Sequence, residues 1–232
     1  MVKMEKNVHS IIDYLKSYAK PETCAGMKQY GINVETALGI PMPVLRRLAK
    51  EIKKNHELAL QLWDTGIHEA RILAGLIDDP KQVTEDQLEW WVVDFDSWDV
   101  CDQVCMNLID KTPFAYKKAM EWSASDEEFV KRAGFAVMAS LAFHDKKAPD
   151  TAFYPFLNRI AESSDDARNF VKKAVNWALR QIGKRNTSLN QKAVETAQFI
   201  LQKNSKAAHW IASDALRELT GESVQKKLCI SV

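Results

Sequence analysis

The chain has 232 residues, of which 46% are hydrophobic and 27% charged, which is enough apolar material for a sizeable core. The net charge of +1 does not indicate a nucleic-acid binder, but 32 basic and 31 acidic residues can still occupy different faces. No run of about 18 apolar residues is present, so no membrane-spanning helix is expected. The polar N-terminus does not resemble a secretion signal. We therefore expect a cytoplasmic protein with no membrane partner, folded as one domain over residues 1–232.

The four cysteines, at positions 24, 101, 105 and 229, form no disulfide framework. Cys101 and Cys105 share a helix face, but no second Cys or His pair stands at the spacing of a zinc finger. Free thiols in a reducing compartment are the simplest interpretation. The sequence therefore predicts no metal site.

Helical periodicity runs through the chain, and strand signals are nearly absent. Apolar residues recur at a spacing of about 3.6, and glycines and prolines fall between the periodic segments. Pro43 suits the first turn of a helix, and Thr84 with Gln87 matches a capping box. In chain order, the predicted helices cover residues 4–19, 21–30, 44–54, 58–63, 68–77, 84–93, 97–110, 113–123, 126–144, 151–162, 166–184, 188–203 and 205–219.

Several of these helices resemble one another. The segments that begin at Glu69, Phe129 and Phe170 look alike, and the last two begin 41 residues apart. Helical self-similarity at about 30–45 residues is typical of a HEAT-like α-solenoid. We therefore predict an all-α superhelix of about six helix pairs, in which one helix of each pair lines a concave surface.

A basic residue follows the first turn of each similar helix. Arg71, Arg132 and Lys173 would then form a row along the concave surface. A repeated basic position on repeated helices is an arrangement that tracks a phosphate backbone, so this surface is a candidate DNA-binding groove. Scattered, solvated cations explain the same residues equally well.

The stretch FDSWDVCDQVC combines an indole and a carboxylate on one helix face. Ser97, or Asp96 before it, is suited to cap the helix, and Trp98 and Asp102 then lie one turn apart. A positively charged ring or sugar is a target that suits both groups. The alternative is a half-buried tryptophan beside a solvated aspartate. Asp99 is the nearest rival carboxylate, although it points off the Trp98 face.

Four side chains on three of the predicted helices connect this stretch to a known family. Trp98 and Asp102 in SWDVCD, with Arg132 in FVKRAGFAVMA and Trp177 in KKAVNWALRQIGK, resemble the AlkD type of DNA alkylation-repair glycosylase. The segment GIPMPVLRRLAKEI, which begins at Gly39, is similar to the N-terminal region of that family. The resemblance covers approximately residues 20–205.

The resemblance implies both a fold and an activity. The family has a HEAT-like fold, removes positively charged N3- and N7-alkylated purines from duplex DNA, and leaves an abasic site. It needs no metal or organic cofactor. By motif match, Asp102 is the catalytic carboxylate and Arg132 supports the DNA backbone. The aromatic pair that flanks the lesion would be Trp98 and Trp177.

Other cations and tryptophans have two interpretations each. Arg180 and Lys184, with Arg185 just beyond them, fit phosphate contacts or favourable cations at a helix C-terminus. Trp177 also fits a core position on its helix. Five further tryptophans are better explained as packing: Trp63, Trp90, Trp91, Trp122 and Trp210.

Three functions remain open at this point. The first is a monofunctional glycosylase that acts on duplex DNA with alkylated bases. The second is a non-catalytic binder of DNA structures on the same scaffold, and the third is a protein-interaction scaffold. A carboxylate such as Asp102 on the floor of a DNA groove repels DNA, and makes little sense unless it takes part in chemistry, which favours the first. Nothing in the sequence calls for an oligomer, so we expect a monomer.

Overall fold

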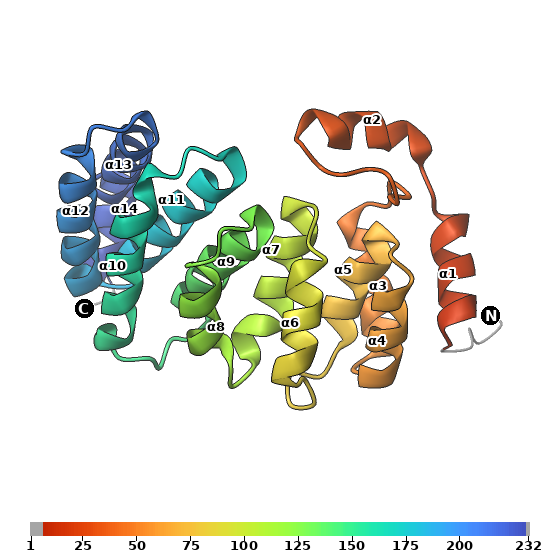
Figure 1. Ribbon diagram of the computed structural model, residues 1–232. Coiled ribbons are helices and arrows are strands. Elements are labelled where there is room, and N and C mark those ends of the chain that lie inside the picture. Colours follow the sequence, from red (N-terminus) through yellow and green to blue (C-terminus); the bar gives the residue numbers. More distant parts are fainter. Residues whose placement is uncertain (1–6, 231–232) are drawn as a thin grey trace. The chain divides into compact units, whose positions relative to one another are not determined.

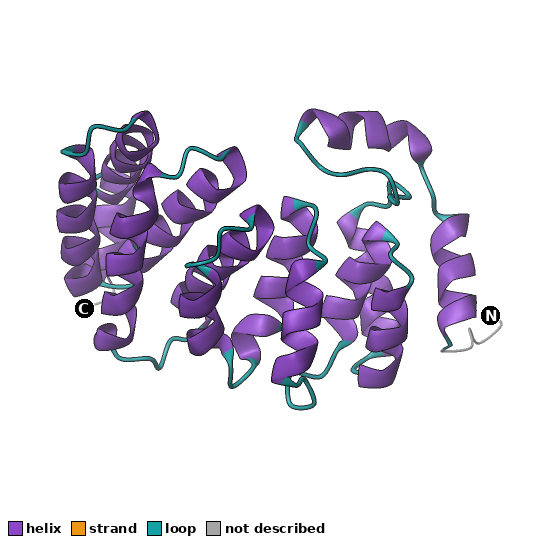
Figure 2. Ribbon diagram, viewed as in Figure 1, coloured by secondary structure: helices purple, strands orange, loops and turns teal. Residues whose placement is uncertain are grey.

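A computed structural model describes residues 7–230 of the protein. Every regular element in this range is helical, and the prediction of an all-α fold is confirmed for it (Figure 2). The range holds fourteen α-helices and three short 3-10 helices. The predicted start of the first helix at residue 4 lies outside the described residues.

Contacts between residues divide the chain into two compact units, Met1–Thr112 and Pro113–Val232. The expectation of one repeat domain stays a prediction. The helices of the first unit are coloured red to yellow-green in Figure 1. They are α1 (Val8–Ser17), α2 (Pro21–Gln29), α3 (Met42–Ile52), α4 (His56–Asp64), α5 (His68–Ile77), α6 (Glu85–Val93), α7 (Trp98–Asn107) and the 3-10 turn η1 (Ile109–Lys111).

Helix α5 is the centre of the first unit, where it packs against α1, α3, α4 and α7. Most of its residues are buried, because apolar side chains cover nearly its whole circumference. Gly75 allows α7 to approach closely, since a Cβ at this position would meet Val104 at 3.0 Å. Helix α2 has no buried residue and lies beyond one end of α3–α7 (Figure 1).

The second unit contains the remaining helices, coloured green to blue-violet in Figure 1. They are α8 (Ala115–Trp122), α9 (Glu128–His144), η2 (Asp150–Phe153), α10 (Tyr154–Glu162), η3 (Ser163–Asp165), α11 (Asn169–Gly183), α12 (Thr187–Leu201), α13 (Lys206–Leu219) and α14 (Glu222–Ile230).

The two longest similar segments of the sequence form α9 and α11, which pack against each other. Their equivalent aromatic residues, Phe129 and Phe170, stack with ring centroids 5.4 Å apart. Helix α11 also packs against α12 and α13, so it is the central helix of the second unit. The helix α11 is therefore held on several sides by its neighbours.

Most predicted helices are found, some with shifted ends. Residues 68–77 form a helix with the expected bounds, whereas the predicted 97–110 helix ends at Asn107 and continues as η1. Thr84 caps α6 as expected, accepting from the Gln87 amide at 3.1 Å. The Gln87 side chain does not complete the capping box, because its amide donates to Asp78 at 2.7 Å. Helix α14 was not predicted.

Candidate nucleic-acid interface

The first turns of α7 present Trp98 and Asp102 on one helix face, as their spacing predicts. Both side chains are half-buried. The indole Nε1 of Trp98 donates to the carbonyl oxygen of Tyr30 at 3.1 Å, which ties the ring to the end of α2. Val100 and Val104 on the opposite side of α7 are buried in the core, and so are Cys101 and Cys105, which border the Trp98–Asp102 face.

Asp99, the rival carboxylate, has internal partners. Its Oδ2 lies 2.9 Å from Nε2 of His68, and its Oδ1 accepts from the Ser97 hydroxyl at 2.6 Å. Burial alone would raise the pKa of Asp99, but these bonds outweigh burial and hold the pKa below its ordinary value. Asp99 therefore stabilises the start of α7 through these internal bonds.

The capping prediction for α7 is wrong in its detail. Ser97 occupies the N-cap position with extended backbone, but its side chain makes no capping bond. Its hydroxyl donates to the Asp99 carboxylate at 2.6 Å. Asp96 is no substitute, since it accepts from the side-chain amide of Asn33 at 2.7 Å.

The His68–Asp99 pair predicts a pH dependence of stability. Burial lowers the pKa of His68, but the bond to Asp99 together with the negative charges of Asp99, Glu69 and Asp96 raises it more, so the net shift is upward. The stabilisation is then complete below the unfolded value of about 6.5 and is lost as pH rises through the folded pKa. We expect the free energy of unfolding of the wild-type protein, measured by urea denaturation, to fall as the pH rises from about 6.5 through the folded pKa of His68. His68→Gln should flatten this slope, whereas His209→Gln, at an exposed position, should not. Equal slopes in wild type and His68→Gln would contradict the assignment.

Glu69 holds the loop between α2 and α3, which begins at Tyr30. Its carboxylate is 1% exposed and accepts from the backbone amides of Leu38 at 2.8 Å and Ile40 at 3.1 Å. Glu69→Ala leaves both amides without this acceptor, so we expect a loss of about 2–4 kcal/mol in the free energy of unfolding. Hydrogen exchange at the two amides should accelerate.

The matched control for Glu69→Ala is Glu57→Ala, which removes an exposed glutamate on α4. A surface change of this kind should alter the free energy of unfolding by less than about 0.5 kcal/mol. Unchanged exchange at Leu38 and Ile40 in Glu69→Ala would show that the loop is held by other contacts.

Arg71 belongs to an internal cluster of the first unit. Its guanidinium contacts the Asp94 carboxylate at 3.0 Å and lies 5.3 Å from the ring centroid of Trp63. That ring in turn stacks on Trp91 with centroids 3.9 Å apart. Because the guanidinium already has a carboxylate partner, its contact with a DNA phosphate stays a prediction.

The second unit places four of the sequence-predicted residues on one face of α11. Lys173, Trp177, Arg180 and Lys184 follow one another at spacings of three or four residues, which aligns them along the helix and its C-cap. Lys173 is exposed and the other three are half-buried, whereas the opposite face is core. We call these four residues the α11 stripe.

Arg132 lies beneath the start of this helix. It is 5% exposed, and its Nη1 donates to the carbonyl oxygen of Phe170 at 2.6 Å. The arginine therefore holds the first turn of α11, the helix that carries Trp177. A contact between Arg132 and a DNA backbone stays a prediction.

The end of the α11 stripe is paired with acids of α13. Arg180 contacts Asp214 at 3.7 Å and forms a closer ion pair with Glu218, which also accepts from Lys184 at 2.7 Å. Burial raises the pKa of Glu218, but the two cations lower it more. Contacts of these cations with phosphate stay a prediction. Arg185 donates to the Ala142 carbonyl at the end of α9 at 2.8 Å, so it lies at the C-terminus of α9 and not at that of its own helix.

The tryptophans expected to pack divide into two groups. Trp63, Trp91 and Trp122 are buried, as predicted. Trp90 is 72% exposed and Trp210 is 41% exposed, so the packing interpretation is wrong for both. The physical reason at Trp90 is that α6 buries one side only, and the adjacent Trp91 occupies it.

Within residues 7–230, no set of three or more His, Cys, Asp or Glu side chains is arranged to hold a metal ion. All four cysteines are unbridged, and burial raises the pKa of the Cys105 thiol well above its ordinary value. In the same range, no helix has the length and apolar character needed to cross a bilayer.

Two contacts of this region could not be read from local spacing. His68 is 31 residues from Asp99, and Tyr30 is 68 residues from Trp98. The only local signal was the Tyr30-Gly31 pair, which marks the end of α2, where Gly31 adopts a positive φ of 74°.

The described residues form an all-helical repeat fold, in which α7 carries the Trp98–Asp102 pair and α11 carries the α11 stripe. Residues 11–219 match the family model described as DNA alkylation repair enzyme, so the chain belongs to this family. The sequence resemblance is thereby confirmed at the level of the family.

The chain is also similar to proteins of known sequence and to one solved structure. The chain is similar to two uncharacterized Listeria proteins, Lin0241 of Listeria innocua and Lmo0209 of Listeria monocytogenes. Each is 24% identical over 190 residues, which cover 80% of this chain and 83% of the relative. A solved structure described as "a new family of proteins related to the HEAT-like repeat DNA glycosylases with affinity for branched DNA structures" matches with a TM-score of 0.73. It is 24% identical, and the match covers 91% of this chain and 94% of the other. The predicted HEAT-like fold is confirmed.

Proposed function

We propose that the protein is a DNA glycosylase that hydrolyses the N-glycosidic bond of cationic N3- or N7-alkylated purines in duplex DNA and leaves an abasic site. The observation that carries the proposal is the Trp98–Asp102 pair on one face of α7, with the indole bonded to Tyr30 and the adjacent Asp99 bonded internally. Membership of the DNA alkylation repair enzyme family supports the same reaction class.

The residue types suit the chemistry of this substrate. Alkylation at N3 or N7 puts a positive charge on the purine, so the glycosidic bond breaks to release a neutral base without a strong general acid. Charge moves onto the sugar, and the transition state resembles an oxocarbenium ion. The Asp102 carboxylate stabilises this developing charge and orients the attacking water. The face of Trp98 attracts the cationic base or sugar, with a contribution of about 0.5–2 kcal/mol.

The second unit supplies the other proposed contacts. Trp177 is the second aromatic residue for the lesion, and Lys173, Arg180 and Lys184 of the α11 stripe contact phosphates. Arg132 acts by holding α11 through Phe170, and Arg71 is a further phosphate contact. The reaction calls for no cofactor, because the alkylated base carries its own positive charge.

The test is release of free bases from methylated duplex DNA, followed by chromatography. Wild-type protein is expected to release N7-methylguanine and N3-methyladenine, and to leave unmodified guanine and adenine in place. If no base is released while salt-sensitive DNA binding is retained, the glycosylase proposal is wrong.

A second candidate function is non-catalytic binding of DNA structures. One observation favours it: the solved structure with a TM-score of 0.73 is described as having affinity for branched DNA. Gel-shift titration of undamaged branched and linear DNA separates the two candidates. Tighter binding of the branched form, without base release from methylated DNA, would favour the second function.

A further inference from the structure

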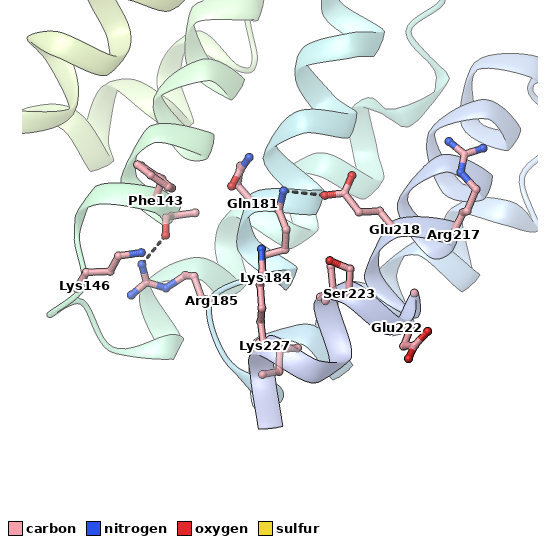
Figure 3. Close-up of a pocket in the computed structure, with 14 residues that line it drawn as sticks. Phe143, Lys146, Gln181, Lys184, Arg185, Arg217, Glu218, Glu222, Ser223 and Lys227 are labelled. Atoms are coloured by element: carbon pink, nitrogen blue, oxygen red, sulfur yellow. Dashed lines mark hydrogen bonds and ion pairs between the residues drawn. The ribbon is translucent and has the colours of Figure 1, made fainter. Parts of the chain in front are cut away.

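A pocket of about 730 Å³ lies within the second unit, between α9, α11, α13 and α14 (Figure 3). Five cationic side chains and two carboxylates line it, which gives the lining a net charge of +3. The cations are Lys146, Lys184, Arg185, Arg217 and Lys227. We call this site the basic pocket.

The carboxylates of the basic pocket already have cationic partners. Glu218 accepts from Lys184 at 2.7 Å and also pairs with Arg180, whereas Glu222 pairs with Lys226 on its own helix. Among the lining cations, Arg217 is in turn paired with Asp214, which lies outside the lining. The five lining cations still outnumber these three carboxylates, so the pocket keeps an excess of positive charge. The N-terminus of the nine-residue helix α14 adds to it, since Ser223 lines the pocket and the first amides of a helix favour an anion.

An exposed aromatic ring completes the lining. Phe143, at the end of α9, is 53% exposed although it is fully apolar, and the Lys146 ammonium lies 5.1 Å from its ring centroid. Figure 3 shows Phe143 and Lys146 on one side of the pocket, and Lys184 and Lys227 nearer its centre, with Arg185 between the two pairs. A flat apolar ring among cations is the combination that binds a nucleotide, because the base stacks on the ring and the phosphate contacts the cations.

We propose that the basic pocket binds one unpaired nucleotide at the end of a DNA strand, with its base on Phe143 and its phosphate at Lys146, Lys227 and the start of α14. The volume supports a single nucleotide, since small-molecule sites measure about 300–1,000 Å³ and a duplex is far larger. The inference rests on the proposed function in one respect only, which is that DNA is the ligand.

The experiment compares two labelled hairpin duplexes by fluorescence anisotropy. One is blunt, and the other carries a short 5′-phosphorylated single-stranded overhang. Wild type is expected to bind the overhang form about tenfold more tightly, as one stacked base predicts. Phe143→Ala should abolish this preference, and Lys146→Ala should weaken it and reduce the salt dependence by about one phosphate contact.

Two matched controls lie on α12, outside the basic pocket. Phe199→Ala removes a ring that is 59% exposed, and Lys192→Ala removes an exposed lysine. Both should keep the overhang preference. Free deoxynucleoside 5′-monophosphate should compete with the overhang for the basic pocket and remove the preference for the overhang hairpin. Inorganic phosphate at equal concentration should not. Equal binding of the two hairpins, or equal competition by inorganic phosphate, would overturn the proposal.

The outcome is separable from the proposed glycosylase reaction. Phe143→Ala should release alkylated bases from blunt duplex DNA at the wild-type rate. Loss of the overhang preference with excision intact would confirm that the basic pocket is a second site. If the wild-type protein prefers the overhang hairpin but releases no base, the glycosylase proposal is overturned and the proposal for the basic pocket stands.

Discussion

Asp102→Asn is expected to lower the rate of alkylpurine release by about a hundredfold to a thousandfold. The amide has nearly the shape of the carboxylate but lacks the negative charge that stabilises the oxocarbenium-like transition state. Because the Asp102 side chain is half-buried and asparagine has nearly the same volume, the fold should tolerate the change. Single-turnover release of N7-methylguanine from methylated duplex DNA measures the effect. DNA affinity should stay the same or increase, since a charge that repels phosphate is removed.

Asp99→Asn is the matched control, with the same chemical change three residues away on the same helix. Asp99 is bonded to His68 and Ser97, so its loss should lower the free energy of unfolding and leave the chemical step largely intact. The catalytic role would be wrongly assigned to Asp102 if Asp99→Asn lost as much activity as Asp102→Asn. The same would follow if Asp102→Asn released bases at nearly the wild-type rate.

Local sequence patterns were sufficient to predict most of the helices. Residues 68–77 were found with their observed bounds, because a stop at Thr65-Gly66 precedes them and Asp78-Asp79-Pro80 follows. Helix α14 was missed for a physical reason. Its core face consists mainly of Val224 and Leu228, one turn apart, and the preceding Gly221 matched the end of a helix and not the start of another.

The candidate site was predictable only where it is local. The i, i+4 relation of Trp98 and Asp102 follows from helix geometry alone, and the same is true of Lys173 and Trp177. What decides the role of each carboxylate is a partner far away in sequence, as His68 is for Asp99. The pairing of Arg180 and Lys184 with Glu218, more than thirty residues away, is likewise a property of how α11 packs on α13.

Gly134→Ala should be strongly destabilising, although alanine favours helices more than glycine does. A Cβ at Gly134 would lie 2.3 Å from the backbone nitrogen and 2.8 Å from the Cα of Ser123, at the end of α8. The conflict is with backbone, so no side-chain rotation relieves it, and α8 and α9 must move apart. We expect a loss of about 3 kcal/mol in the free energy of unfolding, measured by urea denaturation.

Gly26→Ala makes the same substitution on α2, where no atom lies within 4 Å of the added Cβ. Here the change should be stabilising by about 0.5–1 kcal/mol, because only the lower backbone entropy of alanine acts. If the free energy of unfolding falls for Gly134→Ala and rises for Gly26→Ala, the close approach of α8 and α9, and not helix propensity, determines the effect at Gly134. A destabilisation below about 1 kcal/mol at Gly134 would mean that the two helices can part without loss of packing. Arg132 lies two residues earlier on α9. Its hydrogen bond to Phe170 would then not depend on a fixed contact between α8 and α9.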